Sequence, residues 1–295
     1  MQVALEPGKY VLAVSGGVDS MVLLNVLRQL PGLDLLIAHV DHGIRPDSAT
    51  DAALVSEIAK QYGLQFFSTT LQLGATASEA LAREARYQFL ESVRSEQGAD
   101  AIVTAHHQDD AIETAILNMA RGTGRRGLTA LASTPTLQRP LLNISQAEIT
   151  CYAQERKLTW REDSTNVDQR HLRNYIRHSI VPRFSAEQRQ QFVGYLTNLR
   201  QLNADLDQAL AEAVTQLTTD NQIDKQALRV LPSVVSKELL TAWWRQNDFR
   251  NYETKTVSRA FQTLRRGQTG AVVPLKKPFF MTMERTNLAL HKYER

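Results

Sequence analysis

The first half of the chain alternates between short apolar runs and longer amphipathic stretches, and this alternation restricts the fold more than any other feature. The runs typical of buried strands lie at 11–14, 34–40, 65–71 and 101–105, with a shorter one at 158–160. Helix-like stretches separate them; near 49–62, for example, apolar residues recur at helical spacing until Gly63. Strands that alternate with helices predict an α/β fold, with a parallel sheet covered on both faces.

Polar motifs follow four of these runs, where each predicted strand ends. They are SGGVDS at 15–20, HVDHG at 39–43, HHQDD at 106–110 and WREDST at 160–165. Ligands of open parallel sheets bind outside the carboxyl ends of the strands. We therefore expect the four motifs to gather at one edge of the sheet.

The first of these motifs indicates a phosphate-binding loop. Adjacent Gly16 and Gly17 let the backbone turn sharply and approach a ligand without a Cβ in the way. The amides that follow begin a predicted helix, where unpaired N–H groups and the helix dipole favour an anion. The expected phosphate ligands are Ser15, Gly16, Gly17, Val18, Asp19 and Ser20. The loop fits neither G-x-x-x-x-G-K-[ST] nor G-x-G-x-x-G, and an ordinary capped glycine turn stays open as an alternative.

A cluster of histidines and acids occupies the motif after the fourth run. His106 and His107 precede Asp109, Asp110 and Glu113, and the last two share a face because they lie three apart on a predicted helix. Acids in a first helical turn are also expected from the helix dipole alone. The cluster could bind Mg²⁺ through oxygens or hold an amine-bearing substrate. Zinc is disfavoured, because no matching set of His or Cys accompanies the cluster.

Several arginines are candidates for contact with phosphates. On the predicted helix that begins near Thr76, Arg83 and Arg86 share a face, and we expect one of them to reach a phosphate at the sheet edge. The candidates for contact with a nucleic-acid backbone are Arg125 and Arg126 in a glycine-rich loop, and Arg173 and Arg177 at helical spacing. Taken singly, each of these features also fits a solvated surface.

Charge divides unevenly along the chain. The net charge of +3 combines −5 over residues 1–150 with +8 over residues 151–295. An acidic half that carries the loop and a basic half attached to it indicate a catalytic part joined to a polyanion-binding part. Uneven surface charge without such a role remains the alternative.

The single cysteine and the lack of long apolar runs argue against a disulfide-stabilised protein and against a membrane-spanning protein. Cys151 is alone, which excludes a disulfide framework or a Cys-x-x-Cys site within the chain, and we expect its side chain to be buried. No apolar run approaches membrane-spanning length, and the first residues lack the features of a signal peptide. We expect a cytoplasmic protein without a membrane partner.

Three parts follow one another along the sequence. Residues 1–184 form the predicted nucleotide-binding catalytic domain, and 185–217, almost free of Gly and Pro, a long connecting helix. Residues 218–295 form a smaller, mainly helical domain that ends in two or three short strands and is expected to bind RNA.

Over about 11–183 the motifs resemble those of the tRNA(Ile)-lysidine synthetase family, which belongs to the PP-loop ATP pyrophosphatase superfamily. The resembling segments are collinear and include AVSGGVDSMVLL, AHVDHGIRPDS, LAREARYQFL, VTAHHQDDAIETAILNMARGTGRRGL, RPLLNIS and WREDSTNVDQRHLRNYIRHSIVP. The loop alone identifies the superfamily, whereas the later blocks are much more specific. Thr165 departs mildly, since serine is more familiar there, and the family's longer members have a further domain that we do not find.

The resemblance implies an adenine nucleotide alpha hydrolase-like fold and a two-step ligation. ATP adenylates the C2 oxygen of the wobble cytidine in a tRNA(Ile) with a CAU anticodon, and free L-lysine then displaces AMP to form lysidine. The implied catalytic residues are Asp19, Arg86, Asp110 and Glu113. Asp19 would assist Mg²⁺, Arg86 would stabilise charge on the phosphates, and Asp110 with Glu113 would bind the lysine.

Other readings stay open at this point. Among PP-loop enzymes, tRNA thiolases use cysteines that this chain lacks, and GMP and NAD synthetases lack the later basic blocks. A non-catalytic nucleotide-binding or RNA-binding module is the alternative from another class. Also open are whether two chains pair, whether Arg295 is the natural end, and which of Arg83 and Arg86 reaches the phosphates.

Overall fold

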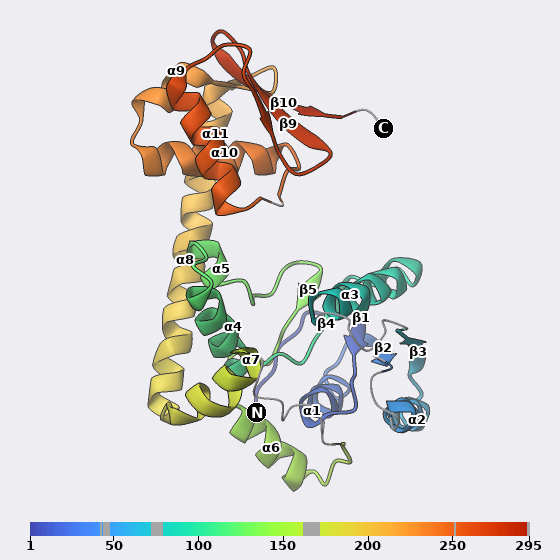
Figure 1. The fold of residues 1–295 in the computed structure, drawn as a ribbon. Coiled ribbons are helices and arrows are strands. Elements are labelled where there is room, and N and C mark those ends of the chain that lie inside the picture. The colour runs from blue at the N-terminus through green and yellow to red at the C-terminus, as the bar shows by residue number, and fades with distance from the viewer. Residues whose placement is uncertain (42, 44–47, 72–78, 162–171, 251, 294–295) are drawn as a thin grey trace. The chain divides into compact units, whose positions relative to one another are not determined.

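The computed structural model describes the whole chain except residues 42, 44–47, 72–78, 162–171, 251 and 294–295. The chain forms two compact units, Met1–Leu199 and Arg200–Arg295 (Figure 1). The expectations for the start of the helix near Thr76, for Thr165, and for most of the WREDST motif fall outside the described residues. No helix among the described residues is long and apolar enough to cross a membrane.

The first unit is built on a five-stranded parallel sheet with the order β3-β2-β1-β4-β5. Its strands are β1 (Gly8–Ala13), β2 (Leu33–Asp41), β3 (Gln65–Thr70), β4 (Ala101–Val103) and β5 (Leu137–Gln138). In the central register, Leu12 lies opposite Ile37 on one side and Val103 on the other. The predicted α/β class and the parallel sheet are confirmed.

The fifth strand is not where the sequence predicted it. Residues 158–160 are outside the sheet, and β5 occupies its edge instead. Helix α6 (Gln146–Glu155) ends just before them, and the Leu158 N–H donates to the carbonyl of Ala153 while Lys157 takes a φ of 51°. Leu158 therefore closes the end of a helix. A two-residue strand such as β5 is too short to show a period of two.

Helices cover both faces of this sheet, as Figure 1 shows. Helices α1 (Val18–Leu27), α2 (Ser48–Gln61) and α6 pack on one face, and α3 (Glu79–Glu96) packs on the other. Alternate strand residues divide between the faces, so that Leu12 joins the first core and Val11 the second. Helix α1 is buried from Ser20 to Leu27 because α6 lies against it.

The expectation that Cys151 is buried is wrong. It is exposed on α6, and its Sγ lies 3.4 Å from Oε1 of Glu155. The helix buries Ile149 and Ala153 instead. A small apolar residue on a surface helix follows the helical face on which it lies, and Cys151 lies on the solvent face.

A second layer of helices completes the first unit. It comprises α4 (Gln108–Ala120), α5 (Arg125–Leu128), α7 (Leu172–Tyr175), a π-helical turn (Ile176–Ile180), a 3-10 turn (Val181–Arg183) and the start of α8 (Ala186–Leu217). Ile112 of α4 packs with Ile176 and Val193. This contact brings the π-helical turn against α4.

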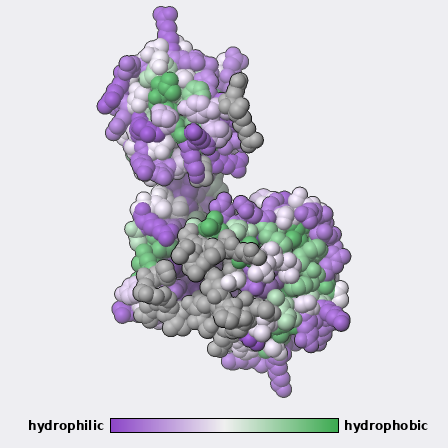
Figure 2. Space-filling model, turned by 45° about the vertical axis from the view of Figure 1, so that its right-hand side comes forward, coloured by the Kyte–Doolittle hydropathy of each residue, from purple (hydrophilic) through white to green (hydrophobic). Residues whose placement is uncertain are grey.

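The second unit packs helices against an antiparallel sheet with the order β6-β7-β10-β9-β8. Its elements after α8 are β6 (Thr218–Thr219), β7 (Gln222–Asp224), α9 (Lys225–Val230), α10 (Ser233–Gln246), α11 (Thr254–Arg266), β8 (Val272–Pro274), β9 (Phe279–Met283) and β10 (Asn287–Lys292). Trp243 and Trp244 are fully buried in its core. The terminal strands were expected, whereas β6 and β7 were not. Figure 2 shows hydrophilic residues over much of each unit on the face in view.

Candidate active site

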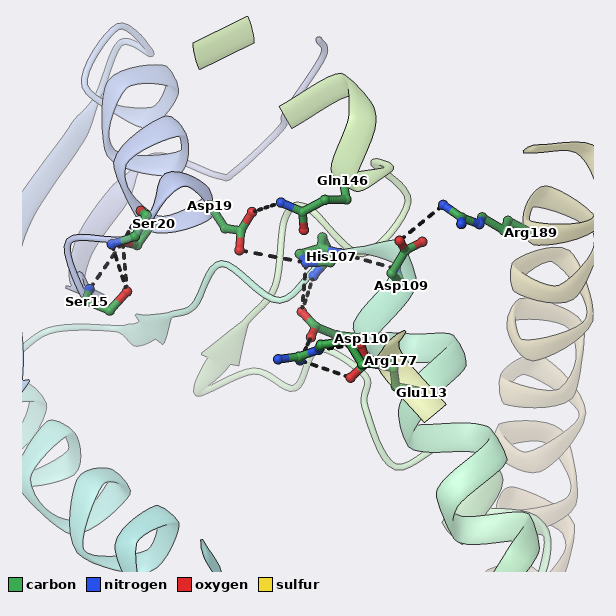
Figure 3. Close-up of polar contacts among 11 residues, drawn as sticks. Ser15, Asp19, Ser20, His107, Asp109, Asp110, Glu113, Gln146, Arg177 and Arg189 are labelled. Carbon is green, nitrogen blue, oxygen red and sulfur yellow. Dashed lines mark hydrogen bonds and ion pairs between the residues drawn. The ribbon is translucent and has the colours of Figure 1, made fainter. Parts of the chain in front are cut away.

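The loop after β1 has the geometry of an anion cradle. Gly16 adopts a φ of 92°, a conformation that L side chains rarely take, and Gly17 begins α1 without a side-chain cap. The Ser20 hydroxyl donates to the Gly17 carbonyl at 2.9 Å and accepts the Ser15 N–H at 3.2 Å (Figure 3). The two serines thus brace the turn, while the first amides of α1 are left without a side-chain cap.

Asp19 points from the start of α1 toward two side chains that follow other strands of the sheet (Figure 3). Its Oδ1 accepts a hydrogen bond from Gln146 at 2.9 Å, and its Oδ2 lies 3.8 Å from Nε2 of His107. Burial raises the pKa of Asp19, and the neighbouring His107 opposes that rise. Sequence reasoning missed Gln146, which lies 127 positions away along the chain.

His107 has a structural role at the start of α4. Its ring Nδ1 accepts a hydrogen bond from the backbone N–H of Asp109 at 3.3 Å. Its backbone N–H donates to Oδ2 of Asp110 at 3.0 Å, and the two bonds form a capping box. A ring that accepts at Nδ1 carries its proton on Nε2 when neutral. That nitrogen lies 3.5 Å from Oδ2 of Asp110, so His107 connects the Asp110 and Asp19 carboxylates.

Asp110 and Glu113 do share one face of α4, and an arginine bridges them. Arg177 donates from Nε to Oε1 of Glu113 at 2.7 Å and from its NH2 nitrogen to Oε2 of Glu113 at 3.0 Å. The same NH2 nitrogen donates to Oδ1 of Asp110 at 3.2 Å. Arg173 adds a longer ion pair, with its Nε 3.8 Å from Oε2 of Glu113. The two carboxylates therefore already have cationic partners.

Burial and charge act in opposite directions on these groups. Burial raises the pKa of Glu113, although the hydrogen bond from Arg177 opposes it. Burial also acts to raise the pKa of Asp110, but its interactions with His107 and His106, the hydrogen bond from the His107 backbone N–H, and the Arg177 guanidinium together bring it below its usual value. Burial would lower the pKa of Arg177, and its bonds to Glu113 raise it instead.

Arg173 and Arg177 were expected to form a basic stripe for RNA, and the structure places them against α4. Their helical spacing does put both guanidinium groups on one side, where both pair with Glu113. The predicted contact of these two arginines with RNA stays a prediction. What the structure does show is that both arginines form ion pairs within the site.

A cavity of about 360 Å³ lies beside the loop, at the carboxyl ends of β1 and β4. Its polar lining consists of Ser15, Asp19, Ser20, Arg86, His106, Asp110, Arg177 and Thr104. Chain order reverses between β1 and β4, and such a switch point is where open α/β sheets bind ligands. The motifs that follow β1 and β4 thus share one cavity, as expected.

The lining of the cavity distinguishes between candidate residues that the sequence alone left equivalent. Arg86 lines it and Arg83 does not, although both guanidinium groups lie over the Tyr87 ring, at 5.3 and 4.9 Å. Glu113 is not part of the lining and lies behind Arg177. Burial lowers the pKa of His106 to about 3, so its ring is neutral at physiological pH. Its Nδ1 lies 2.8 Å from the Thr104 hydroxyl.

Arg125 and Arg126 form part of the short helix α5, away from this lining. Both are partly buried, and their role in RNA contact stays a prediction. Within the described residues, no group of three or more His, Cys, Asp and Glu is arranged to hold a metal ion.

Comparisons with known proteins place the first unit in a family. Residues 2–184 match the model of the PP-loop domain. A tRNA(Ile)-lysidine synthase of Solibacter usitatus is 33% identical over 78% of this chain and 54% of its own length. Those of Deinococcus radiodurans and Exiguobacterium sibiricum are 36% and 32% identical, over 80% and 84% of this chain and 41% and 61% of their own. The chain thus spans roughly half the length of these relatives. Among solved structures, a U34-tRNA thiolase of Methanococcus maripaludis covers 67% of the chain at 20% identity and a TM-score of 0.44, a distant likeness.

Proposed function

Because the chain belongs to the PP-loop family, we propose that it uses ATP to join free L-lysine to C2 of the wobble cytidine in a tRNA(Ile) with a CAU anticodon. The observation that carries this proposal is the common cavity of the phosphate loop, Asp19, Arg86 and Asp110. The names of the similar proteins support tRNA(Ile) as the substrate and lysidine as the product. The product would be lysidine, with AMP and pyrophosphate released.

In the first step, the C2 oxygen of the cytidine would attack the α-phosphate of ATP and release pyrophosphate. The amides at the start of α1 and the hydroxyls of Ser15 and Ser20 would hold the phosphates. Arg86 is the lining cation of α3 and would stabilise negative charge that develops on them.

A magnesium ion fits this site only in company with the phosphates. Asp19 presents a carboxylate into the cavity, and Mg²⁺ in nucleotide sites is held by one or two carboxylates together with phosphate oxygens and water. Bound there, the ion would neutralise phosphate charge. Asp19 would hold it, while Gln146 keeps the carboxylate oriented.

In the second step, the ε-amine of lysine would displace AMP from C2. Asp110 lines the cavity and would receive the ammonium group, whereas Glu113 would act through Arg177. Because Arg177 already bridges both carboxylates, the lysine ammonium would share them or displace the guanidinium. The amine must also lose a proton before it attacks.

Pyrophosphate release that requires both tRNA and lysine is the experiment that tests this function. Dependence on tRNA with a sulfur donor in place of lysine would identify a thiolase. Release without tRNA would indicate a synthetase of the NAD or GMP type, and no release under any of these conditions would indicate a non-catalytic module. We place the reaction in the cytoplasm; pairing of two chains would appear in its sedimentation.

We predict that the double variant Arg125→Ala/Arg126→Ala binds tRNA more weakly and with a shallower salt dependence. Each lost phosphate contact removes about one released counterion from the log–log slope. ATP affinity without tRNA should not change, because neither arginine lines the cavity. Titrations of tRNA at several salt concentrations measure the slope.

The matched control is Arg28→Ala/Lys60→Ala, which removes two exposed cations near the ends of α1 and α2, at the opposite edge of the sheet. It should keep the parent's slope. If the Arg125/Arg126 variant also keeps it, these arginines are surface residues without an RNA contact.

A further inference from the structure

We propose that the second unit contains a binding site for an unpaired RNA base, at a cavity beside β10 that is separate from the nucleotide site. The proposal rests on the proposed function in one respect, that the RNA is a tRNA. Three features of the unit carry it: the polar lining of the cavity, a row of aromatic rings that leads to it, and positive charge.

The cavity has a volume of about 590 Å³ and a lining able to read a base edge. Asn221, Gln246, Asn247 and Asp248 line it with amide and carboxylate groups, which provide both donors and acceptors. Two of the amides are held in place, because Asn247 donates to the Trp243 carbonyl at 2.9 Å and Gln246 to the Ala211 carbonyl at 3.3 Å. Fixed amides of this kind favour hydrogen bonds to the Watson–Crick edge of an unstacked base.

Three aromatic side chains stand in a row on the face of the sheet opposite to its core. Alternate residues of β9 are buried, and Phe280 lies on the other face, paired across the strands with His291. The Phe280 and His291 rings stack with centroids 4.9 Å apart and planes at 20°, and the Tyr293 ring lies 4.6 Å from that of Phe280. His291 also lines the cavity, so the row ends at its wall.

The accessibility of these rings does not follow from core packing. Tyr293 is 49% exposed, and Phe280 and His291 are partly exposed. Hydrophobic packing alone would bury such rings on the core face, where Phe279, Met281 and Met283 already fill the space. Aromatic rings on an open sheet face are the surface on which RNA-binding modules stack bases.

The positive charge of residues 218–295 favours RNA over other polar partners that could fit the cavity. Residues 218–295 contain 14 Lys and Arg against 7 Asp and Glu. Lys292 lines the cavity, and Lys276 and Lys277 lie in the turn that precedes β9. A phosphate alone would not need the Asp248 carboxylate, which repels it, whereas a base can donate to that carboxylate. The lining, the rings and the lysines together fit a nucleotide of single-stranded RNA.

The test uses the full chain and a labelled oligouridine as the probe. Tyr293→Ala and His291→Ala should each weaken binding about tenfold without changing the salt slope, because stacking does not release counterions. Lys292→Ala should weaken binding and make the slope shallower. Tyr195→Ala, which removes an aromatic residue 76% exposed on α8 in the first unit, is the matched control and should bind like the parent.

Parental affinity in both aromatic variants would overturn the proposal. A shallower salt slope in either aromatic variant would also overturn it, because stacking releases no counterions. Tyr293 is half exposed, so its replacement decides the question even if His291→Ala fails to fold. Pyrophosphate release by the parent reports separately on the proposed function. A parent that binds oligouridine but never releases pyrophosphate would contradict that function and keep the base site.

Discussion

Replacing Asp19 by asparagine is expected to lower tRNA-dependent pyrophosphate release by about 10²-fold or more, the scale on which a preorganised charged group at a reacting phosphate acts. The change removes a negative charge beside the phosphate loop and no side-chain volume. Asparagine can still accept the hydrogen bond from Gln146, so the fold should be kept. Pyrophosphate release and the thermal midpoint of unfolding measure the two effects.

Asp34→Asn is the matched control, because Asp34 is exposed near the start of β2, at the opposite edge of the sheet. It should release pyrophosphate at the parental rate. A parental rate in Asp19→Asn as well would show that the loop after β1 does not handle the phosphates, and the proposed first step would be wrong.

The second large effect is expected from Glu113→Gln. The side chain is 2% exposed and accepts two hydrogen bonds from Arg177, so the neutral amide leaves that guanidinium without its main partner. We expect KM for lysine to rise about tenfold or more, since Arg177 and Asp110 would no longer be held together. Unfolding should also become easier by about 1–3 kcal/mol. The affinity for ATP should not change, because Glu113 does not line the cavity.

Asp109→Asn is the control that separates the effect on KM for lysine from the effect on stability. Asp109 lies on the same helix, has a side chain that is only 14% exposed, and pairs with Arg189 at 3.2 Å without lining the cavity (Figure 3). This control should lose stability and keep the parental KM for lysine. If Glu113→Gln also keeps that KM and its turnover, Glu113 serves the stability of the fold and takes no part in lysine binding.

Local rules were enough to predict the glycine turn after β1 and the face that the acids of α4 share. A strand followed by two glycines and a helix has few backbone solutions, and Gly16 takes the positive φ that makes the turn possible. Asp110 and Glu113 share a face because a helix repeats every 3.6 residues. The order of strands also placed both motifs at one edge, since parallel strands present their carboxyl ends together.

Only the tertiary structure decided what each of these faces meets. The spacing of Arg173 and Arg177 shows that they share a face, and the packing of Ile176 against Ile112 turns that face toward Glu113. Gln146 reaches Asp19 because α6 packs on α1. Periodicity records which residues lie together on one element, whereas contacts between elements depend on how buried surfaces fit. That fit involves pairs of residues far apart in the chain, and no local pattern encodes it.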